Sequence, residues 1–225
     1  MKTTMSDDQL LQSYMPLVHF LGEALGSTCE IALHDVRNPD NSLIAITNND
    51  GISRRSIGSP LTDFGLKIMK EKNYKNKEFI TKYPSKTTDG KILRSSSFFI
   101  KNNDNEVIGL LCINVNISDF IHAANFLNKF LSEISGGPER NLAEEKNPLP
   151  NNLSGSMDEL LISIIENTMA EINVPPERMS PEEKMSIVHK LDEKGVFLLK
   201  GAVGEVAEYL KTSENTIYRY INKKD

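Results

Sequence analysis

The sequence has no stretch of 18 or more uncharged apolar residues, so nothing in it predicts a membrane-spanning helix. Its first eight residues are mostly polar and lack the apolar core of a secretory signal peptide. We therefore expect a cytoplasmic protein with no membrane partner. The chain has 225 residues, of which 39% are hydrophobic, enough for one large domain or two small ones.

Sequence patterns of enzymes are also missing. There is no Gly-x-Ser-x-Gly elbow, no P-loop, no Gly-x-Gly-x-x-Gly after a strand and no Cys-x-x-Cys pair. Cys29 and Cys112 lie in apolar runs and are expected to be reduced core thiols, with redox sensing as the alternative. The histidines show no metal-type spacing with cysteines or acids: His19, His34, His122 and His189. We expect neither an enzyme nor a cofactor or metal site.

Positive charge is not abundant. The net charge is −5, which argues against a protein that coats nucleic acid through bulk charge. The charge is uneven, however: residues 1–135 are neutral overall, residues 136–177 carry −6, and residues 178–225 carry +1. The acidity of the middle segment therefore says little about what either end binds.

The first 135 residues have the apolar pattern of a small α+β domain. An opening helix runs to Gly26, with Pro16 as either a kink or a second start. Two hairpins and two further helices are expected, and residues 73–90 are expected to be irregular. The strands cover 29–36, 42–47, 91–101 and 106–116, and the helices cover 62–72 and 117–134. This order predicts a PAS-like antiparallel sheet with helices on one side, able to hold a ligand cavity.

Residues 136–156 are rich in Asn, Pro, Ser and Glu and have no apolar period. They predict a flexible acidic linker between a sensor domain at 1–135 and a helical region at 157–225. The helix expected at 157–172 either connects the domains or pairs with its copy in a dimer.

The strongest local signal lies in residues 180–225. Ser180-Pro-Glu-Glu183 has the pattern of a capping box with proline at the first helical position. Residues 201–210 then predict a helix with an apolar face, and Lys211-Thr212 a turn. Ser213 is suited to cap a second helix by accepting from the backbone N–H of Asn215 or Thr216. The pattern is typical of a helix-turn-helix, and the alternative is a three-helix packing module.

A recognition helix enters the major groove with its N-terminal residues at the base edges. We expect Glu214, Asn215 and Tyr218 there, since Asn can bind adenine and Glu can accept from cytosine. Phosphate contacts are expected from polar and basic neighbours. The full predicted DNA-binding set is Thr212, Ser213, Glu214, Asn215, Thr216, Tyr218, Arg219 and Lys223.

Seven segments carry a family resemblance: YMPLV (14–18), EIALHD (30–35), SPLTD (59–63), DGKILRS (89–95), LCIN (111–114), GVFLLKGAV (195–203) and TIYRYI (216–221). Together they resemble the bacterial YheO-like PAS-domain regulators with a DauR-type helix-turn-helix, over nearly the whole chain. The resemblance implies a PAS-like sensor followed by a DNA-binding domain. One departure is that Arg54 stands where the family usually has glycine, and the family's loop histidine is absent. One class of members is implied in D-arginine use, which points to an amino-acid-like effector.

Polar residues near the strands are candidates for a ligand site, since Asn and Ser are disfavoured in strands. The predicted set is His34, Asp35, Asn48, Arg55, Asp63, Ser96 and Asn114. Each could instead be a satisfied structural group.

We therefore expect a transcription regulator, a homodimer that binds double-stranded DNA and senses a small polar metabolite. The alternative function is a protein-interaction adaptor that uses the terminal helices to bind a partner. The exposed face of the last helix discriminates between these two functions, because an apolar face would favour the adaptor.

Overall fold

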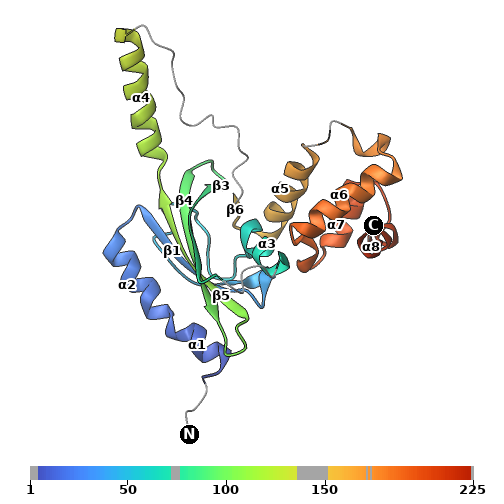
Figure 1. Ribbon diagram of the computed structural model, residues 1–225, viewed down its shortest axis with the longest axis horizontal. Helices are drawn as coiled ribbons and strands as arrows, with labels where there is room; N and C mark the ends of the chain where they lie inside the picture. The colour runs from blue at the N-terminus through green and yellow to red at the C-terminus, as the bar shows by residue number, and fades with distance from the viewer. Residues whose placement is uncertain (1–4, 72–76, 136–151, 171, 173, 224–225) are drawn as a thin grey trace.

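The computed structural model describes residues 5–71, 77–135, 152–170, 172 and 174–223. A twisted sheet forms one part of the molecule, and a cluster of helices lies beside it (Figure 1). No helix in these described ranges is both long and apolar enough to cross a membrane.

The opening segment forms two helices, α1 (Asp7–Ser13) and α2 (Met15–Leu25). Ser6 and Gln9 make a reciprocal capping box that begins α1. Pro16 occupies the first turn of α2, where its missing N–H leaves no helical bond unmade, so it marks a second start and not a kink. Gly26 ends α2 with a φ of 79°, as predicted.

The sheet has the strand order β2-β1-β5-β4-β3-β6, and its first five strands in this order are antiparallel. Both predicted hairpins are present, and Asn105 adopts the left-handed backbone that the second turn requires. The strands are β1 (Cys29–Asp35), β2 (Leu43–Thr47), β3 (Phe79–Thr87), β4 (Ile92–Lys101), β5 (Val107–Asn116) and β6 (Asn152–Leu153).

Strand β3 lies within residues 73–90, where the prediction of irregular structure was wrong. It pairs with β4 over its length, but with β6 only at Lys86 and Thr87. Only Ser85 and Thr87 of its side chains are buried, so the strand lacks the apolar alternation by which strands are recognised. Because β3 lies at the edge of the sheet except where it pairs with β6, it tolerates Pro84 and the irregular register that precedes this proline.

Helices cover both faces of the sheet, so the prediction of one covered side was also wrong. On one face α1 and α2 bury Leu11 and Val18 against Ile31 and Leu33 of β1. On the other face lie α3 (Asp63–Glu71) and the C-terminal helices (Figure 1). Thr62 caps α3 by accepting from Gly65 N at 3.2 Å.

The C-terminal part contains α5 (Met157–Met169), α6 (Pro181–Glu193), α7 (Ala202–Tyr209) and α8 (Glu214–Asn222). Ser180 and Glu183 form the predicted capping box of α6. The three last helices share a core of fully buried aliphatic side chains: Ile187, Val188, Leu191, Val206, Leu210 and Ile217. An all-α domain therefore follows the PAS-like domain.

This helical part is packed directly onto the PAS-like domain. Lys70 of α3 pairs with Asp192 of α6 at 2.5 Å, and Lys200 N donates to Asp40 Oδ1 at 3.1 Å. Gly195 lies so close to α3 that an added Cβ would stand 2.7 Å from the Leu66 carbonyl oxygen. One apolar cluster spans both parts.

Most of the predicted linker at 136–156 lies outside the described residues. Its last five residues are part of the packed structure, since Leu153 and Ser154 are buried and Ser156 caps α5. The remainder of the linker stays a prediction.

Helix α4 (Ser118–Ser135) extends away from the sheet (Figure 1). Ser118 was predicted as its N-cap but is its first helical residue, and its hydroxyl accepts from Ile92 N at 2.9 Å. Large apolar side chains of the predicted apolar face are exposed, Phe120 to 70% and Leu127 to 57%.

Candidate DNA-reading helix and sensor cavity

Helices α7 and α8 form a helix-turn-helix. Thr212 N donates to Ala207 O at 2.9 Å and Lys211 has a φ of 51°, so the chain turns sharply between the helices. Ser213 caps α8 by accepting from Thr216 N at 3.3 Å, as the sequence predicted. Ile217 and Tyr220 then face the core, which fixes the opposite side of α8 outward.

The outward side of α8 is polar. Six of the predicted DNA-binding residues are exposed there, and Thr212 and Thr216 are half-buried: the exposed ones are Ser213, Glu214, Asn215, Tyr218, Arg219 and Lys223. Thr216 Oγ1 contacts Ser213 Oγ at 3.0 Å and so supports the cap. Tyr218, 51% exposed, is the large apolar contribution to this surface.

A small cavity lies between the sheet and α3. Its volume is about 10 Å³, close to the space of one water molecule. Strands of the sheet, the loop before α3, α3 itself and β6 supply its walls: His34, Arg55, Thr62, Phe64, Tyr83, Ser97, Leu110, Cys112, Asn114 and Leu153.

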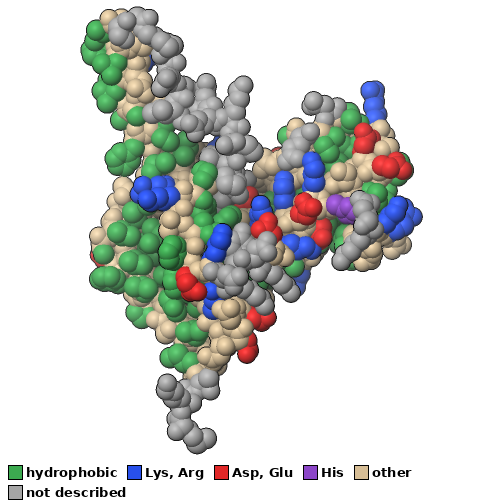
Figure 2. Space-filling view, viewed as in Figure 1, with side chains coloured by type: hydrophobic (Ala, Val, Ile, Leu, Met, Phe, Trp, Pro, Cys, Tyr) green, Lys and Arg blue, Asp and Glu red, His purple; other side chains and the backbone are tan. Residues whose placement is uncertain are grey.

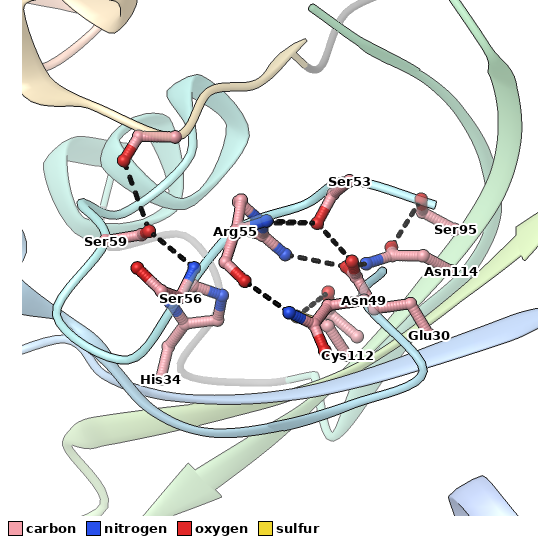
Figure 3. Close-up of polar contacts among 12 residues, drawn as sticks. Glu30, His34, Asn49, Ser53, Arg55, Ser56, Ser59, Ser95, Cys112 and Asn114 are labelled. Carbon is pink, nitrogen blue, oxygen red and sulfur yellow. Dashed lines mark hydrogen bonds and ion pairs between the residues drawn. The ribbon is translucent and has the colours of Figure 1, made fainter. Parts of the chain in front are cut away.

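A buried ion pair between Glu30 and Arg55 forms the polar side of this region (Figure 3). Glu30 is 0% and Arg55 1% exposed, and Arg55 Nη2 donates to Glu30 Oε1 at 2.9 Å. Glu30 Oε1 also accepts from Asn114 Nδ2 at 2.9 Å, and Ser95 Oγ donates to Asn114 Oδ1 at 2.7 Å. Ser53 Oγ donates to Glu30 Oε2 and accepts from Arg55 Nε.

Arg55 retains one unsatisfied donor. Its Nη1 atom is buried and has no hydrogen-bond partner among the residues that the structure describes. Since Arg55 lines the cavity, an oxygen placed there could accept from it.

The other titratable groups of the cavity are held neutral. Burial, together with the positive charge of Arg55, lowers the pKa of His34 well below its usual value, and His34 Nδ1 contacts Ser42 Oγ at 2.8 Å. Burial raises the pKa values of Tyr83 and Cys112, whose side chains both contact Ser97. Burial is thus the main cause of all three pKa shifts. Both cysteines are buried free thiols, as expected.

Three of the predicted ligand residues, His34, Arg55 and Asn114, meet at the cavity. The structure does not bring Asp35 or Asn48 there. Asp35 binds Arg37, whose hydrogen bonds lower the pKa of the Asp35 carboxyl against the opposing effect of burial. The Asn48 amide donates to three backbone carbonyls at the end of α2 and the start of β1.

Asp63 and Ser96 also lie away from the cavity lining. Asp63 Oδ1 accepts from Phe64 N at 2.7 Å in the first turn of α3. Ser96 points to the opposite face of β4 from its buried neighbours Ser95 and Ser97, because side chains alternate along a strand.

Sequence reasoning missed four residues of this region: Glu30, Ser53, Tyr83 and Cys112. Glu30, a charged residue placed between Cys29 and the apolar run 31–33 of β1, was the available signal. Arg54, which replaces the family's usual glycine, has a φ of 56°, a backbone region that glycine adopts without strain.

Comparison with known proteins agrees with both parts of the molecule. Residues 5–132 match the family described as YheO-like PAS domain, and residues 160–222 match a family of helix-turn-helix domains. The chain is 31% identical to an uncharacterized protein of Haemophilus influenzae, over 98% of this chain and 93% of that protein. It is 29% identical to the uncharacterized protein YheO of Escherichia coli, over 97% and 86% of the two chains. It is 26% identical to the transcriptional regulator DauR of Pseudomonas aeruginosa, over 97% and 96%.

Proposed function

This chain belongs to the YheO-like PAS-domain family of transcription regulators with a C-terminal helix-turn-helix, and we propose that its PAS-like domain senses a small polar metabolite and thereby changes operator binding by α8. The observation that carries the DNA-binding half is the exposed, polar N-terminal half of α8. The observation that carries the sensing half is the buried, unsatisfied donor of Arg55 at the cavity.

For DNA binding, the end of α8 at Ser213 enters the major groove of the operator. Asn215 is suited to bind adenine through two hydrogen bonds, and Glu214 to accept from cytosine N4. Arg219 and Lys223 lie further along the helix, where they contact phosphates. The polar character of this surface favours DNA over the protein partner of an adaptor.

A homodimer is part of this proposal. A region with a net charge of only +1 has little electrostatic affinity for DNA, and phosphate contacts supply much of the binding energy. Two copies double the contacts and bind two half-sites about 34 Å apart.

For sensing, the ligand supplies an acceptor oxygen to Arg55 Nη1. Glu30 already balances the charge of Arg55, so a carbonyl, hydroxyl or carboxylate oxygen can serve. The cavity holds about one water molecule, so a metabolite enters only if its walls move apart.

The walls that must move also carry the helical part. Thr62 and Phe64 at the start of α3, and Leu153 of β6, all line the cavity. Helix α3 contacts α6, and β6 leads directly into α5. A ligand that separates α3 from the sheet therefore favours a different placement of α6 to α8. A coupling of about 1–3 kcal/mol would change DNA affinity roughly 5- to 150-fold.

The DNA-binding half is tested after selection of an operator from a random DNA pool. At fixed salt, Asn215→Ala and Tyr218→Ala should each weaken specific binding by about 1–3 kcal/mol. Asn222→Ala is the matched control, an exposed asparagine two turns further along α8. Unchanged specific binding in both test variants would exclude α8 as the recognition helix.

The sensing half is tested by thermal-shift screening of the full chain against amino acids and related polar metabolites, followed by DNA titration with each hit. A ligand of the cavity should raise the melting temperature of the wild type and lose its effect in Arg55→Lys, which lacks the planar group. A hit that stabilises the protein but leaves DNA affinity unchanged would show that sensing and DNA binding are not coupled.

A further inference from the structure

Helix α4 exposes large apolar side chains along most of its length. Its sequence, SDFIHAANFLNKFLSEIS, contains three phenylalanines but only two acids and one lysine. Six large apolar side chains are at least half exposed: Phe120 70%, Phe126 70%, Leu127 57%, Phe130 54%, Leu131 58% and Ile134 70%. Exposed patches of this kind mark interaction sites.

The spacing of these residues specifies another helix as the partner. Apolar residues recur at alternating intervals of four and three, which is the repeat of a coiled-coil seam: Phe120, Ala124, Leu127, Leu131 and Ile134. Phe126 and Phe130 border one side of this seam and widen it. A seam of this repeat packs best against a second helix with the same repeat.

The part of the chain that the structure describes does not supply that helix. Helix α4 extends away from the sheet in Figure 1, and these six large apolar side chains remain more than half exposed.

The exposed area matches what a dimer needs. With roughly 150–250 Å² for each aromatic side chain, the three phenylalanines alone offer on the order of 400 Å², and Leu127, Leu131 and Ile134 add to this area. A standard interface buries about 800 Å² on each partner. Figure 2 shows hydrophobic side chains along α4 and on the same side of the molecule below it.

We propose that α4 is the dimerisation helix of this protein, packing along α4 of a second copy through the seam from Phe120 to Ile134. The inference rests on the proposed DNA binding by a homodimer and gives that dimer its surface. It leaves α8 free, since α8 lies on the far side of the helical part from α4 (Figure 1). It also connects the dimer to the sensor, because β5 carries Cys112 and Asn114 from the cavity directly into α4.

The test is the molar mass of the full chain by size-exclusion chromatography with light scattering. The wild type should have twice the 25.2 kDa of one chain. Leu127→Glu and Leu131→Glu should each give the mass of one chain, because a carboxylate in the seam must lose its water. His122→Glu places the same charge on the opposite side of α4 and should remain a dimer.

Both leucines are exposed in the single copy, so circular dichroism of the variants should match that of the wild type. A second measurement does not require a substitution that breaks the dimer interface. The natural cysteines are buried, so Leu127→Cys adds one accessible thiol that should cross-link two copies on oxidation, whereas His122→Cys should not.

A wild type with the mass of one chain would overturn the proposal, as would a dimer that survives both glutamate variants and does not cross-link through position 127. Failure of the DNA-binding proposal looks different. Asn215→Ala should stay dimeric while losing operator affinity. If Leu127→Glu were a monomer that kept full operator affinity, α4 would still be the dimer interface, but the proposal that a dimer binds two half-sites would be refuted.

Discussion

Replacing Glu30 by glutamine tests whether the buried ion pair stabilises the PAS-like domain. Glutamine has nearly the same shape as glutamate and keeps an oxygen for Arg55 Nη2 and Asn114 Nδ2, now both at 2.9 Å from Glu30 Oε1. The new amide nitrogen faces Ser53 Oγ, which already accepts from Arg55 N and Nε, so the hydrogen bond that Ser53 donates to Glu30 is lost. The substitution therefore removes a charge while conserving packing and most hydrogen bonds.

The expected effect is large because Arg55 stays charged and only 1% exposed after its counter-charge is lost. Breaking a buried pair on one side typically lowers the free energy of unfolding by 3–5 kcal/mol, and the conserved hydrogen bonds place Glu30→Gln near about 3 kcal/mol. For a chain of this size, about 3 kcal/mol corresponds to a melting temperature roughly 6–12 °C lower.

Thermal and urea unfolding measure the change, with Glu71→Gln as the matched control. Glu71 pairs with Lys67 on the surface of α3, where such a pair contributes only about 0.3–0.5 kcal/mol. Adding Arg55→Gln to Glu30→Gln removes the uncompensated charge, so the double variant should lose less than the two single losses combined. A loss for Glu30→Gln no greater than that for Glu71→Gln would refute this account of the pair.

Three further changes test the packing of the two parts and the titration of His34. Gly22→Ala would place a Cβ 2.2 Å from Thr47 Cγ2 and should lower the free energy of unfolding by about 1–3 kcal/mol. Gly51→Ala is the control, because its Cβ would meet open space. Equal melting temperatures for the two variants would contradict the packing of α2 on β2. Gly195→Ala combines a φ of 77° with a 2.7 Å contact to the α3 backbone, and should speed amide exchange in α3 and α6; unaltered exchange would argue against this junction. Burial lowers the pKa of His34, so below about pH 6.5 the unfolded chain binds a proton that the folded chain excludes. The free energy of unfolding should therefore decrease as the pH is lowered below about 6.5, by up to about 1.4 kcal/mol per pH unit. Urea unfolding should show a weaker slope in His34→Gln, and an identical slope would mean that His34 is protonated in the fold.

Local chemistry made the helix-turn-helix predictable. Ser180 and Ser213 each accept a hydrogen bond from a backbone N–H three residues further along the chain, so a few neighbouring residues determine where each helix begins. The apolar spacing of α7 and α8 then decides which side of α8 faces outward, because a helix repeats every 3.6 residues.

Strand β3 and helix α4 show the opposite case. The side chains of β3 are mostly exposed, and its place is set by pairing with β4, which no short window of sequence reveals. The apolar face of α4 was visible in the sequence, but its periodicity could not say whether the face meets this chain's own core or lies exposed.

By itself, the sequence determined the two-part organisation, most helix ends and the polar face of α8, because each depends on residues close together in the chain. Only the tertiary structure decided which polar residues meet at the cavity. The register of β1 on β5 and of β5 on β4 aligns Glu30, Asn114 and Ser95 across three strands. Arg55 then reaches this row from a loop 25 residues beyond Glu30. A slip of one residue in either pairing would turn these side chains to the other face of the sheet, and that register is set by packing between distant segments.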